Sequence, residues 1–493
     1  MEEQNKITKK RHSNKHTLFA LCMALLMLLS FAGGYYVHRL TYGKESKTPI
    51  DVLNLIEKVG YVYDPDSNDY VELDGDKVAE IIAEKFLDQY STYYTKAEYE
   101  KVQAESKGEY SGFGFTWSYK EETDGGISLG SIPVKPLHST NGNSPAYNAG
   151  IMAGDVIEGA KKSTDTTVTN FSTQQQLVDF LSATEKDVDY IFYLKDKEEP
   201  VTIKKTDYKA TYVEYYDSEN ALTFTYEGND LTNVVTARPT VTLSELNGKT
   251  DVFYVILKAF QGNAFGEMER AFAYAKEQGK TQLVLDIRNN GGGSMDVLEK
   301  IASLIIDGNG LQVKLVSAVG KNETTHFSTD RDRFDGFIEK ISVIANENSA
   351  SASECLLGAM LYHYGEKYKM AETEEDKAKY NSTDCTVFGF GRLVIVKNQD
   401  GVAKTYGKGI MQTTYQLTSG GALKLTTALL RWPDHSKYHE GTSIHGIGIL
   451  PKVAVQGANP NDSANAVIDS LALSRALATL DEGAIILDPV VTP

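Results

Sequence analysis

A serine and a lysine in two short segments rich in small residues could form a catalytic pair. The first segment is Ser349-Ala-Ser-Ala-Ser-Glu354, and the second is Thr405-Tyr-Gly-Lys-Gly409. A serine hydroxyl becomes a good nucleophile only when a base removes its proton, and a lysine can be that base only if burial lowers its pKa. Gly407 and Gly409 would let the backbone enclose Lys408 closely. The two segments therefore indicate a serine-lysine dyad.

A run of three glycines could supply the groups that stabilise a developing negative charge. The segment Ile287-Arg-Asn-Asn-Gly-Gly-Gly293 follows a predicted buried strand at 282–286 and precedes a predicted helix at 295–306. Glycines there allow a sharp turn with exposed backbone N–H groups, as in an oxyanion hole. The run also resembles a phosphate-binding loop, but no glycine loop in the chain is followed by Gly-Lys-Ser/Thr.

Histidines provide the rival mechanism, because a Ser-His-Asp triad is defined by geometry rather than by order in the sequence. The candidates are His326, His363, His435, His439 and His445. His435 and His439 have the spacing of helical metal ligands, but Pro433 and the polar residues around them indicate a loop. There is no His-Glu-x-x-His motif, so we assign no metal.

Composition indicates a large folded protein with an acidic surface. The 493 residues are 41% apolar and carry a formal net charge of −17, which argues against a nucleic-acid partner. Cys22, Cys355 and Cys385 lack the spacing of a metal site; only Cys355 and Cys385 could pair, and the sequence leaves that pairing open.

An uncharged stretch at 17–37 is long enough to cross a bilayer and follows a basic tail at 1–16. A signal peptide is the alternative, but the stretch is long, Tyr35 and Tyr36 suit an interfacial anchor, and no clear Ala-x-Ala site follows. We therefore predict a single-pass transmembrane anchor at the cell membrane. The rest of the chain would lie outside the cytoplasm.

Helical periodicity predicts an N-terminal helical region at 38–107, in which Thr95 and Glu98 form a capping box. Residues 108–210 then read as a β-rich module with strands near 127–132 and 201–204, a short helix closed by Gly150, and a second helix within 171–181. This module resembles a PDZ domain. The loop Ser111-Gly112-Phe113-Gly114 would present N–H groups to a peptide's C-terminal carboxylate.

Strand and helix signals alternate from 241 to 493 and indicate a mixed α/β core, with 211–240 as a connecting segment. As a whole, the chain after the predicted anchor resembles the C-terminal processing (tail-specific) peptidase family. The matching segments, in order, are 87–94, 108–114, 149–156, 286–293, 346–354, 406–409 and 423–427. The resemblance implies a ClpP/crotonase-like serine peptidase core with a serine-lysine dyad.

The resemblance also assigns roles to single residues. Ser351 would be the nucleophile, with Ser349 and Ser353 as its competitors, and Lys408 would be the general base. Gln412 would hold the lysine or the substrate. The N–H groups of Gly292 and Ala352 would form the oxyanion hole, with Gly293 as a further candidate.

Two departures from the family pattern stand out. The chain carries an insertion at about 365–400, and Tyr362 stands where some relatives have an aspartate. The sequence thus predicts a membrane-anchored serine endopeptidase without cofactors that captures protein C-terminal tails. The alternative is a catalytically silent PDZ scaffold that binds tails at the membrane surface. The oligomeric state stays open.

Overall fold

The computed structural model describes the following residues: 63–64, 69–70, 74–115, 127–128, 144–151, 155–238, 243–308, 310–330, 336–370, 387–388, 391–397, 403–433, 445–449, 453–456 and 470–480. The predicted tail at 1–16, the predicted transmembrane segment at 17–37 and most of the predicted insertion at 365–400 lie outside these residues, as do His435 and His439. Within the described ranges, every helix is too short or too polar to span a membrane.

The chain divides into two compact units, 1–81 and 82–493. In the first unit, the short strands β1 (Tyr63–Asp64) and β2 (Asp69–Tyr70) pair antiparallel, and α3 (Gly75–Phe86) begins. All remaining elements belong to the second unit.

A large mixed sheet forms the centre of the second unit. Its order is β13-β12-β11-β14-β15-β18-β20-β19, and β23 pairs with β20. The strands are β11 (Val213–Asp217), β12 (Asn220–Glu227), β13 (Asp230–Ala237), β14 (Val252–Leu257), β15 (Gln282–Asp286), β18 (Lys340–Asn346), β19 (Val387–Phe388), β20 (Gly391–Lys397) and β23 (Val453–Gln456). From β14 through β15, β18 and β20 to β23 the neighbours run parallel, which confirms the mixed α/β class.

The predicted connecting segment at 211–240 is instead part of this sheet, so the core begins before residue 241. Strand β11 pairs antiparallel with β14 and is buried along its whole length. Its charged residues concealed it in the sequence. The side chain of Glu214 forms an ion pair with Lys258 at 2.7 Å, and Asp217 accepts a hydrogen bond from the Tyr215 hydroxyl at 3.0 Å. Buried carboxylates with such partners are compatible with a central strand.

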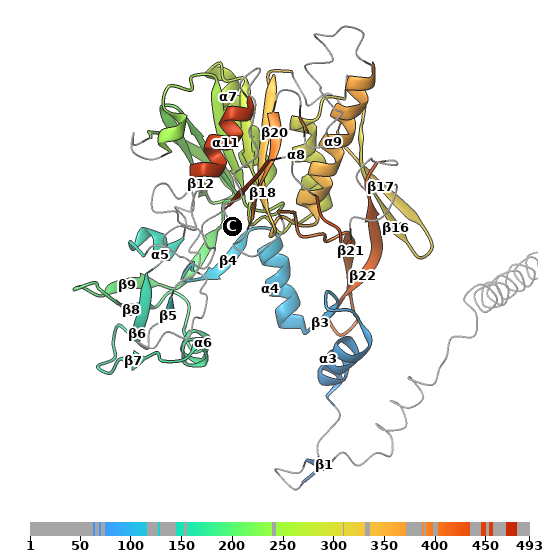
Figure 1. Ribbon diagram of the computed structural model, residues 1–493. Coiled ribbons are helices and arrows are strands. Elements are labelled where there is room, and N and C mark those ends of the chain that lie inside the picture. The colour runs from blue at the N-terminus through green and yellow to red at the C-terminus, as the bar shows by residue number, and fades with distance from the viewer. Residues whose placement is uncertain are drawn as a thin grey trace, which may run out of the picture. The chain divides into compact units, whose positions relative to one another are not determined.

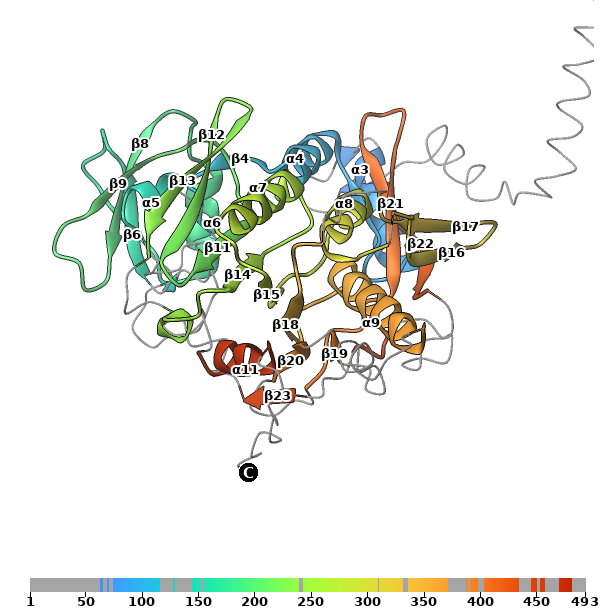
Figure 2. The same cartoon turned by 90° about the horizontal axis from the view of Figure 1, so that it is seen from above.

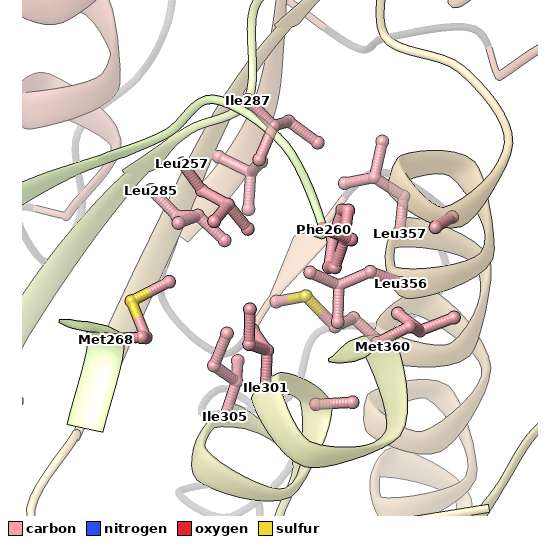
Figure 3. Packing of buried hydrophobic residues seen from close by; sticks show 14 of the residues in the cluster. Leu257, Phe260, Met268, Leu285, Ile287, Ile301, Ile305, Leu356, Leu357 and Met360 are labelled. Carbon is pink, nitrogen blue, oxygen red and sulfur yellow. The ribbon is translucent and has the colours of Figure 1, made fainter. Parts of the chain in front are cut away.

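Helices cover both faces of the sheet, with α7 (Ala264–Glu277), α8 (Met295–Ile305) and α9 (Ala352–Met370) on one face and α11 (Ser470–Leu480) on the other (Figure 2). Alternate residues of β14 serve the two faces: Val255 and Leu257 join the cluster with α7, α8 and α9, whereas Tyr254 joins the cluster with α11. Figure 3 shows the first cluster from close by, where Leu285 of β15 lies among its buried side chains.

A second sheet has the order β17-β16-β22-β21, and β3 pairs with β22 (Figure 1). Its strands are β3 (Thr92–Tyr94), β16 (Lys314–Gly320), β17 (Thr324–Ser328), β21 (Ile410–Gln416) and β22 (Ala422–Arg431). Helix α4 (Lys96–Ser106) follows β3 directly. The predicted capping box is confirmed, because Thr95 and Glu98 each accept a hydrogen bond from the other's backbone N–H.

The β-rich module has its own apolar core around Phe113, Leu177 and Phe192. Strand β4 (Glu109–Gly112) pairs with β10 (Thr206–Lys209). The remaining elements are β5 (Ile127–Ser128), α5 (Pro145–Asn148), β6 (Val156–Lys162), β7 (Thr169–Asn170), α6 (Gln174–Ser182), β8 (Asp189–Leu194) and β9 (Val201–Lys204). Gly150 ends the short helix in the left-handed conformation (φ +80°), as its position in the sequence predicts.

Leu285→Ala tests the packing of the main sheet against α7, α8 and α9. The side chain is fully buried, so its loss should lower the free energy of unfolding by about 2 to 5 kcal/mol. Urea unfolding of the variant measures the change. Leu417→Ala, at a residue that is 38% exposed, is the control and should stay within about 0.5 kcal/mol of the parent. Equal stability of both variants would contradict the packing described here.

Candidate active site

Three loops meet at one edge of the main sheet. Because β14, β15 and β18 are parallel, their carboxyl ends lie on the same side. The loop after β14 contacts the glycine run, as the Phe260 N–H donates to the Gly292 carbonyl at 2.9 Å. The glycine run in turn contacts the turn after β18, where the Ala350 N–H donates to the Asn290 carbonyl at 3.0 Å. The sheet thus brings the predicted oxyanion loop beside the predicted nucleophile.

Ser351 occupies a strained position between strand and helix. Its φ is +58°, in the left-handed region that non-glycine residues rarely adopt, and α9 begins at the next residue. Strain of this kind gathers at functional sites, and a serine at a sharp strand-to-helix turn resembles a nucleophile elbow. The side chain is half-buried, and its hydroxyl forms no hydrogen bond with any described residue.

The two competing serines are fixed in structural contacts. Both are fully buried. The Ser349 hydroxyl donates to the Ile287 carbonyl at 2.8 Å, and the Ser353 hydroxyl donates to the Asn290 carbonyl at 2.9 Å. Of the three serines, Ser351 therefore has the hydroxyl that is available for chemistry.

Gly292 lies directly against this turn. A Cβ added at Gly292 would come within 2.8 Å of the Ser351 Cβ and 2.9 Å of the Ala352 nitrogen, so only glycine fits, and φ is +102°. The Gly292 N–H itself donates to the Asn290 Oδ1 at 2.9 Å. Among the described residues, the N–H groups of Gly293 and Ala352 have no hydrogen-bond partner. In this geometry they are the backbone donors available near Ser351, with Ala352 at the positive end of α9.

Asn290 connects all three loops. Its Nδ2 donates to the Leu257 carbonyl at 2.9 Å, and its Oδ1 accepts from Gly292. Its carbonyl accepts from both Ala350 and Ser353. The side chain is fully buried, so it fixes the glycine run relative to the Ser351 turn.

Glu354 joins the Ser351 turn to the lysine segment through four hydrogen bonds. Its Oε2 accepts from the N–H groups of Ser351 at 3.0 Å and Lys408 at 2.9 Å. Its Oε1 accepts from the Thr405 hydroxyl at 2.6 Å and the Gly407 N–H at 2.7 Å. Burial raises the pKa of Glu354, and these four donors oppose that rise. One buried carboxylate thus holds the backbones of Ser351 and Lys408 together.

The Lys408 side chain lies in surroundings that favour its neutral form. Burial lowers its pKa, and the like charge of Lys424 on β22 lowers it further. The Nζ atom lies 5.2 Å from the centre of the Tyr90 ring, and no hydrogen bond joins it to the Ser351 hydroxyl. The structure therefore brings the two backbones together while the reactive atoms are not yet in contact.

The remaining predicted site residues lie as follows. Gln412 is on β21, and its Nε2 donates to the Thr426 hydroxyl at 3.3 Å rather than to the lysine. His326 bonds to the Ser317 hydroxyl at 2.9 Å, and His363 bonds to the Lys314 carbonyl at 2.8 Å. Neither of these histidines bonds to Ser351. Cys355 is a free, buried thiol.

Of the predicted carboxylate loop at 111–114, Ser111 and Gly112 are the last residues of strand β4 and lie opposite Asp207 and Thr206 of β10, and the next two residues are held by their carbonyl groups. The Phe113 carbonyl accepts from the Ala146 N–H at 2.8 Å, and the Gly114 carbonyl accepts from the Ser144 hydroxyl at 2.7 Å. The loop lines a cavity of about 1520 Å³ whose lining also includes Val178, Leu181 and Ser182 of α6. The cavity extends to Lys258 and Ala259, which precede Phe260 at the glycine run.

Sequence reasoning assigned no role to Glu354, Asn290 or Lys424, although all three stand in the quoted segments. A second missed feature is Asp286, which is buried at the end of β15 and binds the Arg288 Nη2 at 2.6 Å. The available signal was charge: a glutamate or aspartate at the end of an otherwise apolar or small-residue segment requires partners.

Glu354→Gln should disturb the dyad without removing either of its members. The amide supplies one acceptor oxygen where four donors converge, so the Ser351 turn and the Lys408 segment should separate. We expect the rate at which a fluorophosphonate labels Ser351 to fall about 100-fold, the scale of a 1 Å misplacement. Glu323→Gln on the exposed β16–β17 turn is the control. Labelling at the parent rate in Glu354→Gln would refute this positioning role.

Comparison with known proteins places the chain among serine peptidases. Residues 251–365 match Peptidase family S41. The "Probable CtpA-like serine protease" of Staphylococcus haemolyticus is 28% identical over 419 residues, covering 84% of this chain and 67% of that protein. The protein of the same name from Staphylococcus aureus (strain N315) is 28% identical over 425 residues, covering 83% and 66%. The chain thus spans about two thirds of the length of these curated relatives.

Solved structures give weaker matches. The photosystem II D1 C-terminal processing protease has a TM-score of 0.39 and 22% identity, covering 83% of this chain and 85% of that one. A putative S41 protease from Bacteroides fragilis has a TM-score of 0.46 and 11% identity, covering 80% and 90%. The assignment rests on the sequence matches, which include the glycine run and the Ser351 turn. These matches support the C-terminal processing peptidase family and identify the chain as a serine-type peptidase of the kind found in family S41.

Proposed function

We propose that this protein is a membrane-anchored serine endopeptidase that captures protein C-terminal tails through its PDZ-like module and cleaves peptide bonds with a Ser351–Lys408 dyad. The observation that carries the proposal is the Glu354 contact. A single buried carboxylate binds the backbone of a strained serine with an available hydroxyl and that of a lysine whose pKa is lowered. A purely structural lysine would have no need of such an arrangement.

In the proposed reaction, neutral Lys408 takes the proton of the Ser351 hydroxyl, and the serine oxygen attacks the scissile carbonyl carbon. The lysine then returns the proton to the leaving amine, which leaves an acyl-enzyme. Water hydrolyses this ester through the same base. For the first step the Lys408 side chain must leave the Tyr90 ring and come within hydrogen-bond reach of Ser351, a tightening common on substrate binding.

The negative charge on the substrate oxygen would be stabilised by backbone donors beside Ser351. The Ala352 N–H at the start of α9 is well suited, because the helix dipole adds to the hydrogen bond. The second donor would come from the glycine run. The Gly293 N–H is available there, whereas the Gly292 N–H would first have to leave the Asn290 side chain.

The PDZ-like module would select substrates by their free C-terminus. The carbonyl groups of Phe113 and Gly114 are bonded to the start of α5, so the peptide planes of the loop are fixed. The N–H groups of the loop would bind the carboxylate, and the cavity beside α6 would receive the last side chains. The extension of this cavity toward Lys258 suggests a path from the captured tail to the dyad.

Membrane anchoring rests on the sequence alone. The uncharged stretch at 17–37 and the preceding basic residues support a single helix with the peptidase outside the cytoplasm. The competing proposal is a silent scaffold that binds tails without cutting them. The combination of Ser351, Glu354 and Lys408 favours the peptidase, because binding alone requires none of them.

Ser351→Ala and Lys408→Ala should each abolish cleavage of an unstructured protein with a defined C-terminus. Each change removes half of one catalytic unit, so the double variant should be no slower than either single variant. Cleavage rates of all three variants measure this, and circular dichroism checks their folding. Near-normal turnover by Ser351→Ala would exclude it as the nucleophile, and binding without cleavage by the parent protein would support the scaffold.

A peptide with a free C-terminal acid should bind more tightly than its amidated form, because an amide offers the loop N–H groups no comparable acceptor. Fluorescence anisotropy on the Ser351→Ala protein separates binding from cleavage. Gly112→Val should reduce the difference, since an added Cβ at Gly112 has room in the free protein, with Gly114 nitrogen at 3.9 Å, but would obstruct a ligand. Equal affinities for both peptides would show that the module does not recognise tails.

A further inference from the structure

The segment that precedes α4 is fastened to the lysine-bearing sheet. Strand β3 pairs with β22, so that Thr92 lies opposite Lys424. Just before β3, the Ser91 hydroxyl accepts a hydrogen bond from the Thr426 N–H at 3.0 Å. The Tyr90 N–H donates a hydrogen bond to the Asp88 carboxylate at 3.0 Å. Tyr90 directly precedes Ser91, so its backbone lies beside β22.

The Tyr90 ring is the partner of the Lys408 ammonium. The Nζ atom lies 5.2 Å from the ring centre, within the range of a cation–π contact. The Tyr406 side chain, two residues before the lysine, interacts electrostatically with Tyr90. The ring therefore lies close to the segment that carries the lysine.

The other groups that face Lys408 do not neutralise its charge. Lys424 on β22 repels it. Glu354, the nearest carboxylate of α9 in this network, uses both oxygens for the backbone of the two loops and for Thr405. Among the described residues, no carboxylate lies within ion-pair distance of Lys408. The aromatic face is thus the contact that stabilises the ammonium.

We propose that Tyr90 is a positioning residue of the active site, whose ring holds the Lys408 ammonium in a resting place that the lysine leaves in order to reach Ser351. This rests on the proposed serine-lysine dyad. The ring favours the charged lysine, while burial and Lys424 favour the neutral one. Tyr90 therefore opposes the deprotonation that makes Lys408 a base, and so sets the pH at which the free protein becomes active.

Removal of the Tyr90 ring should lower the pKa of Lys408. A contact that stabilises the ammonium raises the pKa of Lys408, so removal of the ring lowers it. Because the base works in its neutral form, the rising limb of activity moves to lower pH with the pKa. We expect Tyr90→Leu to lower the pKa of Lys408 by about 0.5 to 1 unit, and to move the rising limb of activity to lower pH by the same amount. Tyr90→Phe keeps the ring and should retain most of the parent value.

Two measurements on the full-length protein test this. Competitive labelling with acetic anhydride, with the acetylated Lys408 peptide quantified by mass spectrometry across pH, gives the pKa of Lys408 whether or not the protein cleaves anything. The pH dependence of kcat/KM with a free-acid peptide gives the kinetic limb. Tyr415→Leu, which removes a half-exposed tyrosine from β21, is the matched control and should shift neither.

An unchanged or raised Lys408 pKa in Tyr90→Leu would overturn the proposal. If Tyr90→Leu folds poorly, Tyr90→Met serves instead: it also removes the ring and should lower the pKa of Lys408 to a similar extent, and an unchanged value there would equally overturn the proposal. If the proposed serine-lysine dyad is wrong, the cleavage assay gives a different result. Lys408→Ala would then cleave normally, and the labelling experiment would still decide whether Tyr90 stabilises the ammonium.

Discussion

The carboxylate of Glu354 is the interaction on which the site depends. Ser351 stands on the main sheet and Lys408 on the edge of the second sheet, and each position is determined by a separate set of strands. Four hydrogen bonds to one buried side chain fix these two positions relative to each other. Burial of a charge is tolerated because each oxygen accepts two donors. The relative position of Ser351 and Lys408 is therefore a property of the interface between the sheets.

Ser351 and Lys408 differ in how they are held. The Ser351 turn is rigid: its φ is left-handed, its neighbours Ser349 and Ser353 are anchored, and Gly292 leaves no room beside it. Lys408 is fixed at its backbone, but its side chain rests on an aromatic ring. In the proposed mechanism, the Ser351 turn and the glycine run would thus be preorganised, whereas the Lys408 side chain would be the part that moves. This division places the adjustable step in a long side chain, where rearrangement is easiest.

Local signals in the sequence were sufficient for the strand at 282–286, for helix α8 and for the capping box at Thr95. These elements depend on short-range apolar periodicity or capping chemistry, which a sequence displays directly. Strand β11 was not predicted, because the charged residues Glu214 and Asp217 are more typical of an exposed linker than of a buried strand. The choice of Ser351 over its neighbours required the family resemblance, since Ser349 and Ser353 differ from it only in hydrogen bonds. Glu354 joins the nearby Ser351 to residues more than fifty positions later, and Tyr90 contacts the still more distant Lys408. No local pattern in the sequence indicates contacts of such range.

The pairing of β3 with β22 has a consequence for synthesis of the protein. Thr92 lies opposite Lys424, 332 residues later (424 minus 92), so this edge of the second sheet cannot form until nearly the whole chain has left the ribosome. Contacts of such long range form late in folding. A nascent chain that already carries Ser351 still lacks the segment with Lys408 and the strand that fastens Tyr90. The order of synthesis therefore means that the proposed Ser351–Lys408 pair can assemble only in a nearly complete chain.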